Sequence, residues 1–155
     1  MKKYALVLMV LIVSTSFINA QSSTNLLETN RAFTGAVAKK KSYHAIYQLD
    51  TNDPKIIDKA IHNINNALSD PRLEGKIQIE LVTLSGGTEA VMVGSKFEKD
   101  IKELVEKGVI VAQCNNSLMK RNLTRDQIFN FIAVVPSGNG EIIIRQAEGW
   151  AIIKP

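Results

Sequence analysis

Cys114 is the only cysteine in the 155-residue chain, and its neighbours favour a reactive thiol. The apolar run Val109–Ala112 precedes it, and Asn115, Asn116 and Ser117 follow it. These three residue types favour helix N-caps, because their short side chains accept hydrogen bonds from free backbone N–H groups. The order predicts a strand, the cysteine and then a helix start. A thiol placed there lies near unpaired N–H donors and the positive end of a helix dipole, which stabilise a thiolate.

A single cysteine also leaves other interpretations open. It forms no internal disulfide, although exported proteins ordinarily use cysteines in pairs. Cys114 is therefore a reactive thiol, a buried apolar side chain or one half of an intermolecular disulfide. His44 and His62 are isolated from other ligand side chains, so neither a metal ion nor a cofactor is predicted.

Further polar residues extend the candidate site around the thiol. The turn Ser85-Gly86-Gly87 is either an anion cradle or an ordinary tight turn, since it lacks the P-loop and dinucleotide-binding patterns. Lys120 and Arg121 either supply positive charge near Cys114 or form a solvated helix face. With Cys114 as the candidate catalytic residue, the candidate binding residues are Asn115, Asn116, Ser117, Lys120, Arg121, Ser85, Gly86, Gly87, Ser137 and Gly138.

The segments that must position these residues alternate between strand and helix patterns. Apolar runs predict strands, and three- and four-residue spacing of apolar side chains predicts the helices between them. Nearly continuous apolar strands with helical crossovers predict an α/β fold, with three α/β/α layers around a five-stranded, mainly parallel sheet. Ligands bind at the carboxyl ends of the strands in such sheets. Three features fall there: Ser85-Gly86-Gly87 after the second predicted strand, Cys114 after the third and Ser137-Gly138 after the fourth. The predicted strands are 43–50, 76–84, 109–112, 132–135 and 150–153.

The N-terminus has the pattern of an export signal. Lys2 and Lys3 precede the apolar run Tyr4–Val13, and small residues lead to Ala20, so residues 1–20 are predicted to be a cleaved signal peptide. The run is shorter than the ~20 residues that span a bilayer, and no second long apolar run follows, so no membrane span remains after cleavage. We expect an exported, periplasmic or secreted protein with a flexible segment at 21–41 and one domain at 42–155.

Charge offers little support for a nucleic-acid partner. Without the two lysines of the leader, 17 basic residues face 15 acidic ones. The one dense basic cluster, Lys39–Lys41, precedes the first predicted strand and is interpreted as a solvated linker. We therefore predict no nucleic-acid binding.

The chain resembles the DsrE/DsrF-like proteins of sulfur metabolism from about Tyr43 to Pro155. One match is a cysteine at a strand end followed by a short basic helix and a leucine-threonine turn, Leu123-Thr124. The other match comprises Val134–Gly138, Arg145–Trp150 and Ile153–Pro155. The resemblance implies a homo- or hetero-oligomer and, in sulfur-relay members, a persulfide on the matching cysteine. Asn122 replaces the glycine that normally closes the basic helix, and export would separate the chain from the cytoplasmic partners of the family.

Two functions follow as expectations. In the first, an exported DsrE-like protein accepts or carries sulfane sulfur as a persulfide on Cys114, and it is at most sulfurtransferase-like as an enzyme. Its partners would be a second copy of the chain and a sulfur donor or acceptor, either a protein or a small thiol. In the second, an oligomeric module binds a small anion, a thiol or a partner protein without catalysis, and Cys114 is a buried structural residue.

Overall fold

The computed structural model describes residues 25–155. The predicted signal peptide and its cleavage point lie outside the described residues. The chain divides into two units, Met1–Val37 and Ala38–Pro155. In the first unit, residues 25–31 are helical, and the apolar side chains of Leu26, Leu27 and Phe33 are exposed. Within residues 25–155, no helix combines the length and apolarity needed to cross a membrane.

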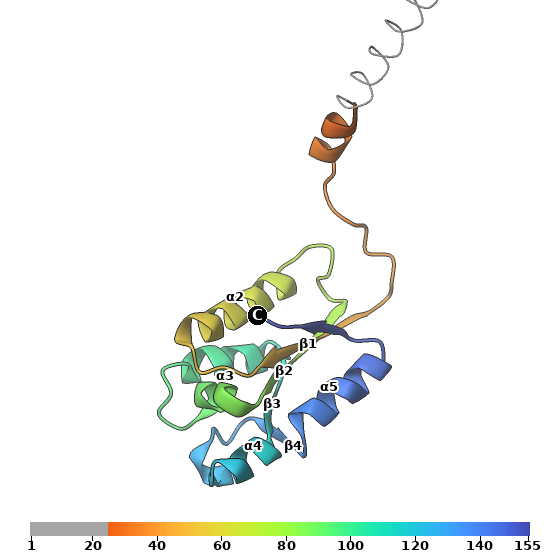
Figure 1. Cartoon of the computed structure of the whole chain (residues 1–155). Coiled ribbons are helices and arrows are strands. Elements are labelled where there is room, and N and C mark those ends of the chain that lie inside the picture. The colour runs from red at the N-terminus through yellow and green to blue at the C-terminus, as the bar shows by residue number, and fades with distance from the viewer. Residues whose placement is uncertain (1–24) are drawn as a thin grey trace, which may run out of the picture. The chain divides into compact units, whose positions relative to one another are not determined.

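The second unit is built on a five-stranded parallel sheet (Figure 1). Neighbouring strands pair in the order β4-β3-β2-β1-β5, and each pair is parallel. The predicted fold class is therefore confirmed. The strands are β1 (Tyr43–Leu49), β2 (Ile77–Thr83), β3 (Ile110–Cys114), β4 (Ala133–Val135) and β5 (Ala151–Ile153).

Helices make every crossover between the strands. Asp53 is the N-cap of the first of these helices, and its side chain accepts a hydrogen bond from the N–H of Lys55. Ser137 is the N-cap of the last helix, and its side chain accepts a hydrogen bond from the N–H of Gly140. The α-helices are α2 (Pro54–Leu68), α3 (Glu98–Glu106), α4 (Asn115–Lys120) and α5 (Gly138–Ala147), and the 3₁₀ helices are η1 (Ser85–Val91) and η2 (Arg125–Gln127).

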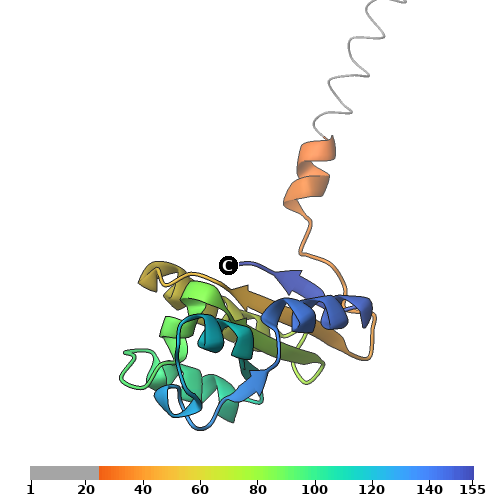
Figure 2. The same ribbon diagram turned by 60° about the horizontal axis from the view of Figure 1, so that its bottom comes forward.

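The strand order places the helices on two faces of the sheet. β1 to β4 advance in one direction, and the chain then returns past β1 to β5. Because parallel crossovers are right-handed, this reversal puts α5 on the face opposite α2 and α3, as Figure 1 and Figure 2 show.

Each face has its own apolar core. The larger core joins alternate sheet residues such as Leu81 and Val111 to α2, α3 and Leu118 of α4. The smaller core lies beneath α5 and contains Ile46, Val82, Leu84, Cys114, Ile142 and Trp150. Because side chains alternate along a strand, the thiol of Cys114 lies on the α5 side and Gln113 on the opposite side.

Candidate functional site

Cys114 occupies the junction between a strand and a helix, as the sequence predicts. It is the last residue of β3 and the N-cap of α4, with an extended backbone at φ −68° and ψ 117°. Its side chain is buried, with 5% of the residue's surface exposed. Cys114 also lines a cavity.

Two helix starts converge on the sulfur of Cys114. Burial alone would raise the pKa of the Cys114 thiol. Hydrogen bonds from the Ser117 hydroxyl and from the backbone N–H groups of Gly138, Ser117 and Asn116 favour the thiolate and hold the pKa below its ordinary value. Asn116 and Ser117 belong to α4, whereas Gly138 begins α5, which lies across 24 residues of chain from the cysteine. The thiolate environment is consequently assembled by the fold from two separate segments.

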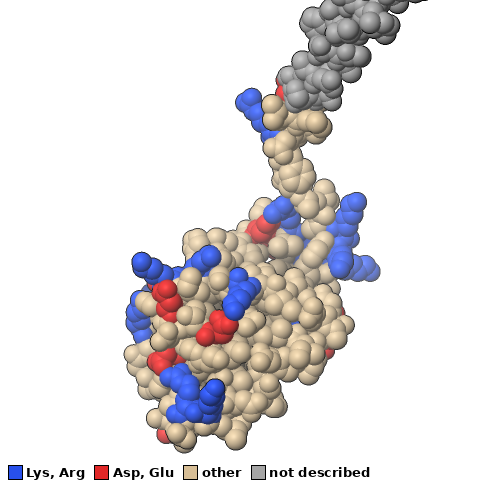
Figure 3. Space-filling view, viewed as in Figure 1, with Lys and Arg blue, Asp and Glu red and all other residues tan. Residues whose placement is uncertain are grey.

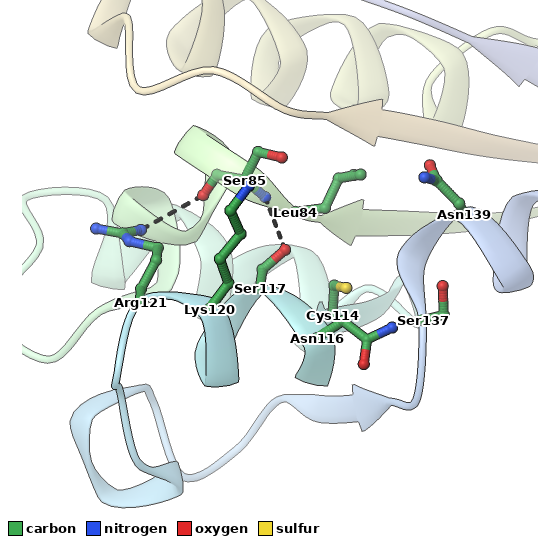
Figure 4. A pocket seen from close by; sticks show the side chains of 9 residues that line it. All are labelled: Leu84, Ser85, Cys114, Asn116, Ser117, Lys120, Arg121, Ser137 and Asn139. Carbon is green, nitrogen blue, oxygen red and sulfur yellow. Dashed lines mark hydrogen bonds between the residues drawn. The ribbon is translucent and has the colours of Figure 1, made fainter.

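The hydroxyl of Ser117 is itself oriented by a third segment. The N–H of Ser85 donates to Ser117 Oγ at 2.9 Å, as Figure 4 shows. This bond occupies a lone pair of the oxygen, so the hydroxyl proton remains for the sulfur of Cys114. Ser85 holds this position with φ 50°, a left-handed conformation that is uncommon for a residue other than glycine. Ser85 therefore orients the Ser117 hydroxyl through its backbone N–H, not through its side chain.

The glycines after Ser85 serve close packing. A Cβ on Gly87 would lie 2.0 Å from the carbonyl oxygen of Leu49, and one on Gly86 would lie 2.9 Å from the N of Asn52. Both glycine N–H groups already donate to backbone carbonyl oxygens, that of Gly86 to Asp50 and that of Gly87 to Leu84. These two N–H groups are therefore not free to bind an anion, and the anion-cradle interpretation fails for Gly86 and Gly87. The alternative prediction was an ordinary tight turn, whereas the segment forms the start of the 3₁₀ helix η1.

A cavity of about 400 Å³ opens beside the sulfur. Six of the predicted binding residues line it together with Cys114, and Figure 4 shows their side chains around the sulfur. The Asn115 amide instead contacts the sulfur of Met119 at 3.5 Å. Leu84 and Asn139 also line the cavity but were not predicted. Leu84 directly precedes Ser85 and Asn139 directly follows Gly138, and this adjacency is the signal that could have identified them. The lining residues are Leu84, Ser85, Cys114, Asn116, Ser117, Lys120, Arg121, Ser137 and Asn139.

The two basic residues of the cavity differ in their surroundings. Arg121 forms an ion pair with Glu89 and donates to the carbonyl oxygen of Ser85 at 3.4 Å, which ties α4 to η1. Lys120 has no ion-pair partner among residues 25–155 and lies at the exposed end of α4. The uncompensated positive charge of the cavity is therefore that of Lys120.

The outer surface of α5 carries two exposed isoleucines. Ile143 and Ile144 are 66% and 56% exposed. In Figure 3, few charged side chains appear on the side of the molecule where α5 lies. In the part of the chain that the structure describes, no group of three or more His, Cys, Asp or Glu side chains is arranged to hold a metal ion.

These features define a class of protein: an α/β domain with a cysteine at the carboxyl edge of a parallel sheet, where neighbouring hydrogen-bond donors stabilise its thiolate. The chain belongs to the DsrE/DsrF-like family, whose model matches residues 9–155. The structure of a protein of unknown function from Methanobacterium thermoautotrophicum is similar, with 33% identity and a TM-score of 0.70 over 74% of this chain and 100% of that one.

A more distant structure shares the fold. A conserved protein of unknown function from Bacteroides thetaiotaomicron is 12% identical, with a TM-score of 0.61 over 78% of this chain and all of the other. Comparison with curated proteins gives no match.

Proposed function

We propose that this protein is an exported member of the DsrE/DsrF-like family that carries sulfane sulfur as a persulfide on Cys114. One observation supports the proposal above all others. The Ser117 hydroxyl and three backbone N–H groups, from two helix starts, hold down the pKa of one thiol beside an open cavity. A buried apolar cysteine needs no such donors.

The chemistry requires a thiolate and a place for a second sulfur. The Cys114 thiolate attacks the outer sulfur of a donor persulfide, so an Sγ–S bond forms while the S–S bond of the donor breaks. The donor's thiolate leaves with the electron pair of that bond. The cavity receives the added sulfur, and the charge of Lys120 favours its anionic form.

Export and assembly belong to the same proposal. The sequence of residues 1–20 supports export, which would require a donor and an acceptor, either a protein or a small thiol, outside the cytoplasm. The exposed isoleucines Ile143 and Ile144 support association with a second copy.

A second candidate function has its own observation. Cys114 belongs to the smaller core together with Val82, Leu84 and Ile142 and is only 5% exposed. This packing favours a non-catalytic module that binds a small anion, a thiol or a partner protein, with Cys114 as a structural residue.

A measurement of sulfur loading distinguishes the two candidate functions. The purified full chain is incubated with inorganic polysulfide, desalted and measured by intact mass spectrometry. We expect wild type to gain the mass of sulfur, removable by a reductant, and Cys114→Ser to gain none while melting at a similar temperature. Loading of Cys114→Ser equal to that of wild type would overturn the sulfur-carrying function. Wild-type labelling with iodoacetamide only after denaturation would support a buried structural Cys114, as in the second function.

A further inference from the structure

Gln113 is a polar side chain buried in the larger core, immediately before Cys114. It is 0% exposed, as are Thr83 of β2 and Thr88 of η1. Burying a carboxamide costs free energy unless its hydrogen bonds are replaced, so its partners are informative. It lies on the opposite side of the sheet from the thiol and is not among the residues that line the cavity; the one lining residue to which its side chain hydrogen-bonds is Cys114, through the backbone carbonyl oxygen.

Each polar atom of the Gln113 side chain has a partner. The Thr83 hydroxyl donates to Gln113 Oε1 at 2.7 Å. Gln113 Nε2 donates to Thr88 Oγ1 at 3.1 Å and to the carbonyl oxygen of Cys114 at 2.9 Å. One carboxamide thus joins β2, η1 and the end of β3. Glutamate would present an unpaired buried carboxylate there, and methionine would fill the volume without these bonds.

The bond to the Cys114 carbonyl oxygen bears on the start of α4. It holds the peptide plane between Cys114 and Asn115, and that plane sets the direction in which the chain enters α4. Asn116 and Ser117, whose N–H groups help to lower the pKa of the thiol, follow two and three residues after Cys114. A rotation of this carbonyl would therefore turn the donors away from the thiolate.

The hydrogen bond from Gln113 to Thr88 affects η1, the segment that orients the Ser117 hydroxyl. Thr88 lies in η1, and the first residue of η1, Ser85, donates to Ser117 Oγ. The carboxamide therefore connects the segment that orients the Ser117 hydroxyl to the segment that carries the thiol.

We propose that Gln113 is a positioning residue for Cys114, whose carboxamide holds the Cys114 carbonyl group and η1 so that the donors of α4 point at the sulfur. The inference rests on the proposed function, because it assigns Gln113 a part in maintaining a reactive thiolate. It adds a residue on the far side of the sheet, outside the cavity.

The test measures how the alkylation rate of Cys114 depends on pH. Iodoacetamide reacts with the native full chain, and intact mass reports the rate from pH 5 to pH 9. The variants are Gln113→Met and the matched pair Thr88→Val and Thr88→Ser, of which only the serine keeps the hydroxyl. We expect the apparent thiol pKa to rise by about one unit in Gln113→Met and Thr88→Val, which slows labelling about tenfold at pH values well below the pKa. Thr88→Ser should keep the wild-type profile.

The outcomes separate this inference from the proposed function. A lowered wild-type thiol pKa that persists in Thr88→Val and Gln113→Met, even if both melt at lower temperatures, overturns the positioning role alone. An ordinary wild-type thiol pKa overturns the reactive thiolate and the positioning role together. If Gln113→Met does not fold, the comparison of Thr88→Val with Thr88→Ser still tests the positioning role, because the two variants differ in the hydroxyl group that accepts the hydrogen bond from Gln113.

Discussion

The N–H of Gly138 helps to lower the pKa of the Cys114 thiol by hydrogen bonding, and a Cβ on Gly138 would lie 3.2 Å from the Cβ of that cysteine. The two residues are neighbours because β4, which leads into α5, pairs with β3 in the register Cys114↔Val135. A side chain at residue 138 would crowd the thiol, so glycine lets the start of α5 lie this close to it. Glycine here brings a donor to the sulfur.

Gly138→Ala should weaken this donor without unfolding the protein. The new methyl group would also meet the Cβ of Leu84 at 3.3 Å, so the α5 start must move by a few tenths of an ångström. Alanine also favours helix, so we expect the free energy of unfolding to change by less than about 1 kcal/mol. The apparent thiol pKa of Cys114 should rise, and iodoacetamide labelling at pH 6 should slow severalfold.

Gly140→Ala is the matched control for that substitution. Its methyl group would lie 3.3 Å from the Cβ of Ser137 and has no cysteine atom among its nearest neighbours. The labelling profile of this control should match wild type. Equal slowing in both variants would contradict a specific role for Gly138.

Ser117→Ala and Asn116→Ala should differ, although both residues line the cavity. Ser117 supplies its hydroxyl as well as its N–H to the sulfur, whereas Asn116 supplies only its N–H, which alanine keeps. Ser117→Ala removes the hydroxyl and leaves the N–H of Ser85 without its acceptor. We expect Ser117→Ala to slow persulfide loading about tenfold at pH 6 by raising the thiol pKa, and Asn116→Ala to load at nearly the wild-type rate. Loading rates from a polysulfide donor, followed by mass spectrometry, provide the comparison.

A buried ion pair under α5 predicts a distinct pH dependence of stability. Glu80 of β2 is 1% exposed, and Arg145 Nε donates to Glu80 Oε2 at 2.7 Å. Burial raises the pKa of Glu80 above its ordinary value of 4.5, and the hydrogen bond and charge of Arg145 only partly offset this. The folded protein thus binds the Glu80 proton more tightly than the unfolded chain. The free energy of unfolding therefore falls as pH rises from about 4.5 through the raised pKa.

Arg145→Met should cost about 3 kcal/mol at pH 7, because it leaves a buried carboxylate unpaired. The loss should shrink as pH falls toward the raised pKa of Glu80, since protonation removes the charge. Glu80→Gln should be nearly neutral at pH 7 and should remove this part of the pH dependence. Urea denaturation at pH 5 and pH 7.5 measures these values, and the double variant should recover most of the loss. A loss in Arg145→Met that is independent of pH would contradict the charge explanation.

The sequence alone predicted much of this architecture, for local reasons. Asp53 caps the helix that Pro54 begins, and Gly149 adopts φ 85° just after the end of α5, as the local preferences of these residue types favour. Asn122 adopts φ 53°, so the asparagine that departs from the family pattern takes the left-handed conformation expected of glycine. Nearly continuous apolar runs predicted the parallel sheet, because strands buried on both faces have apolar side chains at most positions.

The sequence by itself determined that Cys114 ends a strand and begins a helix beside Asn116 and Ser117, because strand patterns and N-cap preferences are local. Only the tertiary structure decided which distant groups meet the sulfur. The N–H of Gly138, the orientation of Ser117 by Ser85 and the buried carboxamide of Gln113 all depend on strand register and on the close packing of β2, η1 and α5. Hydrogen-bond partners separated by tens of residues leave no periodic signal in a chain, so the surroundings of the thiol emerge only when the sheet is assembled.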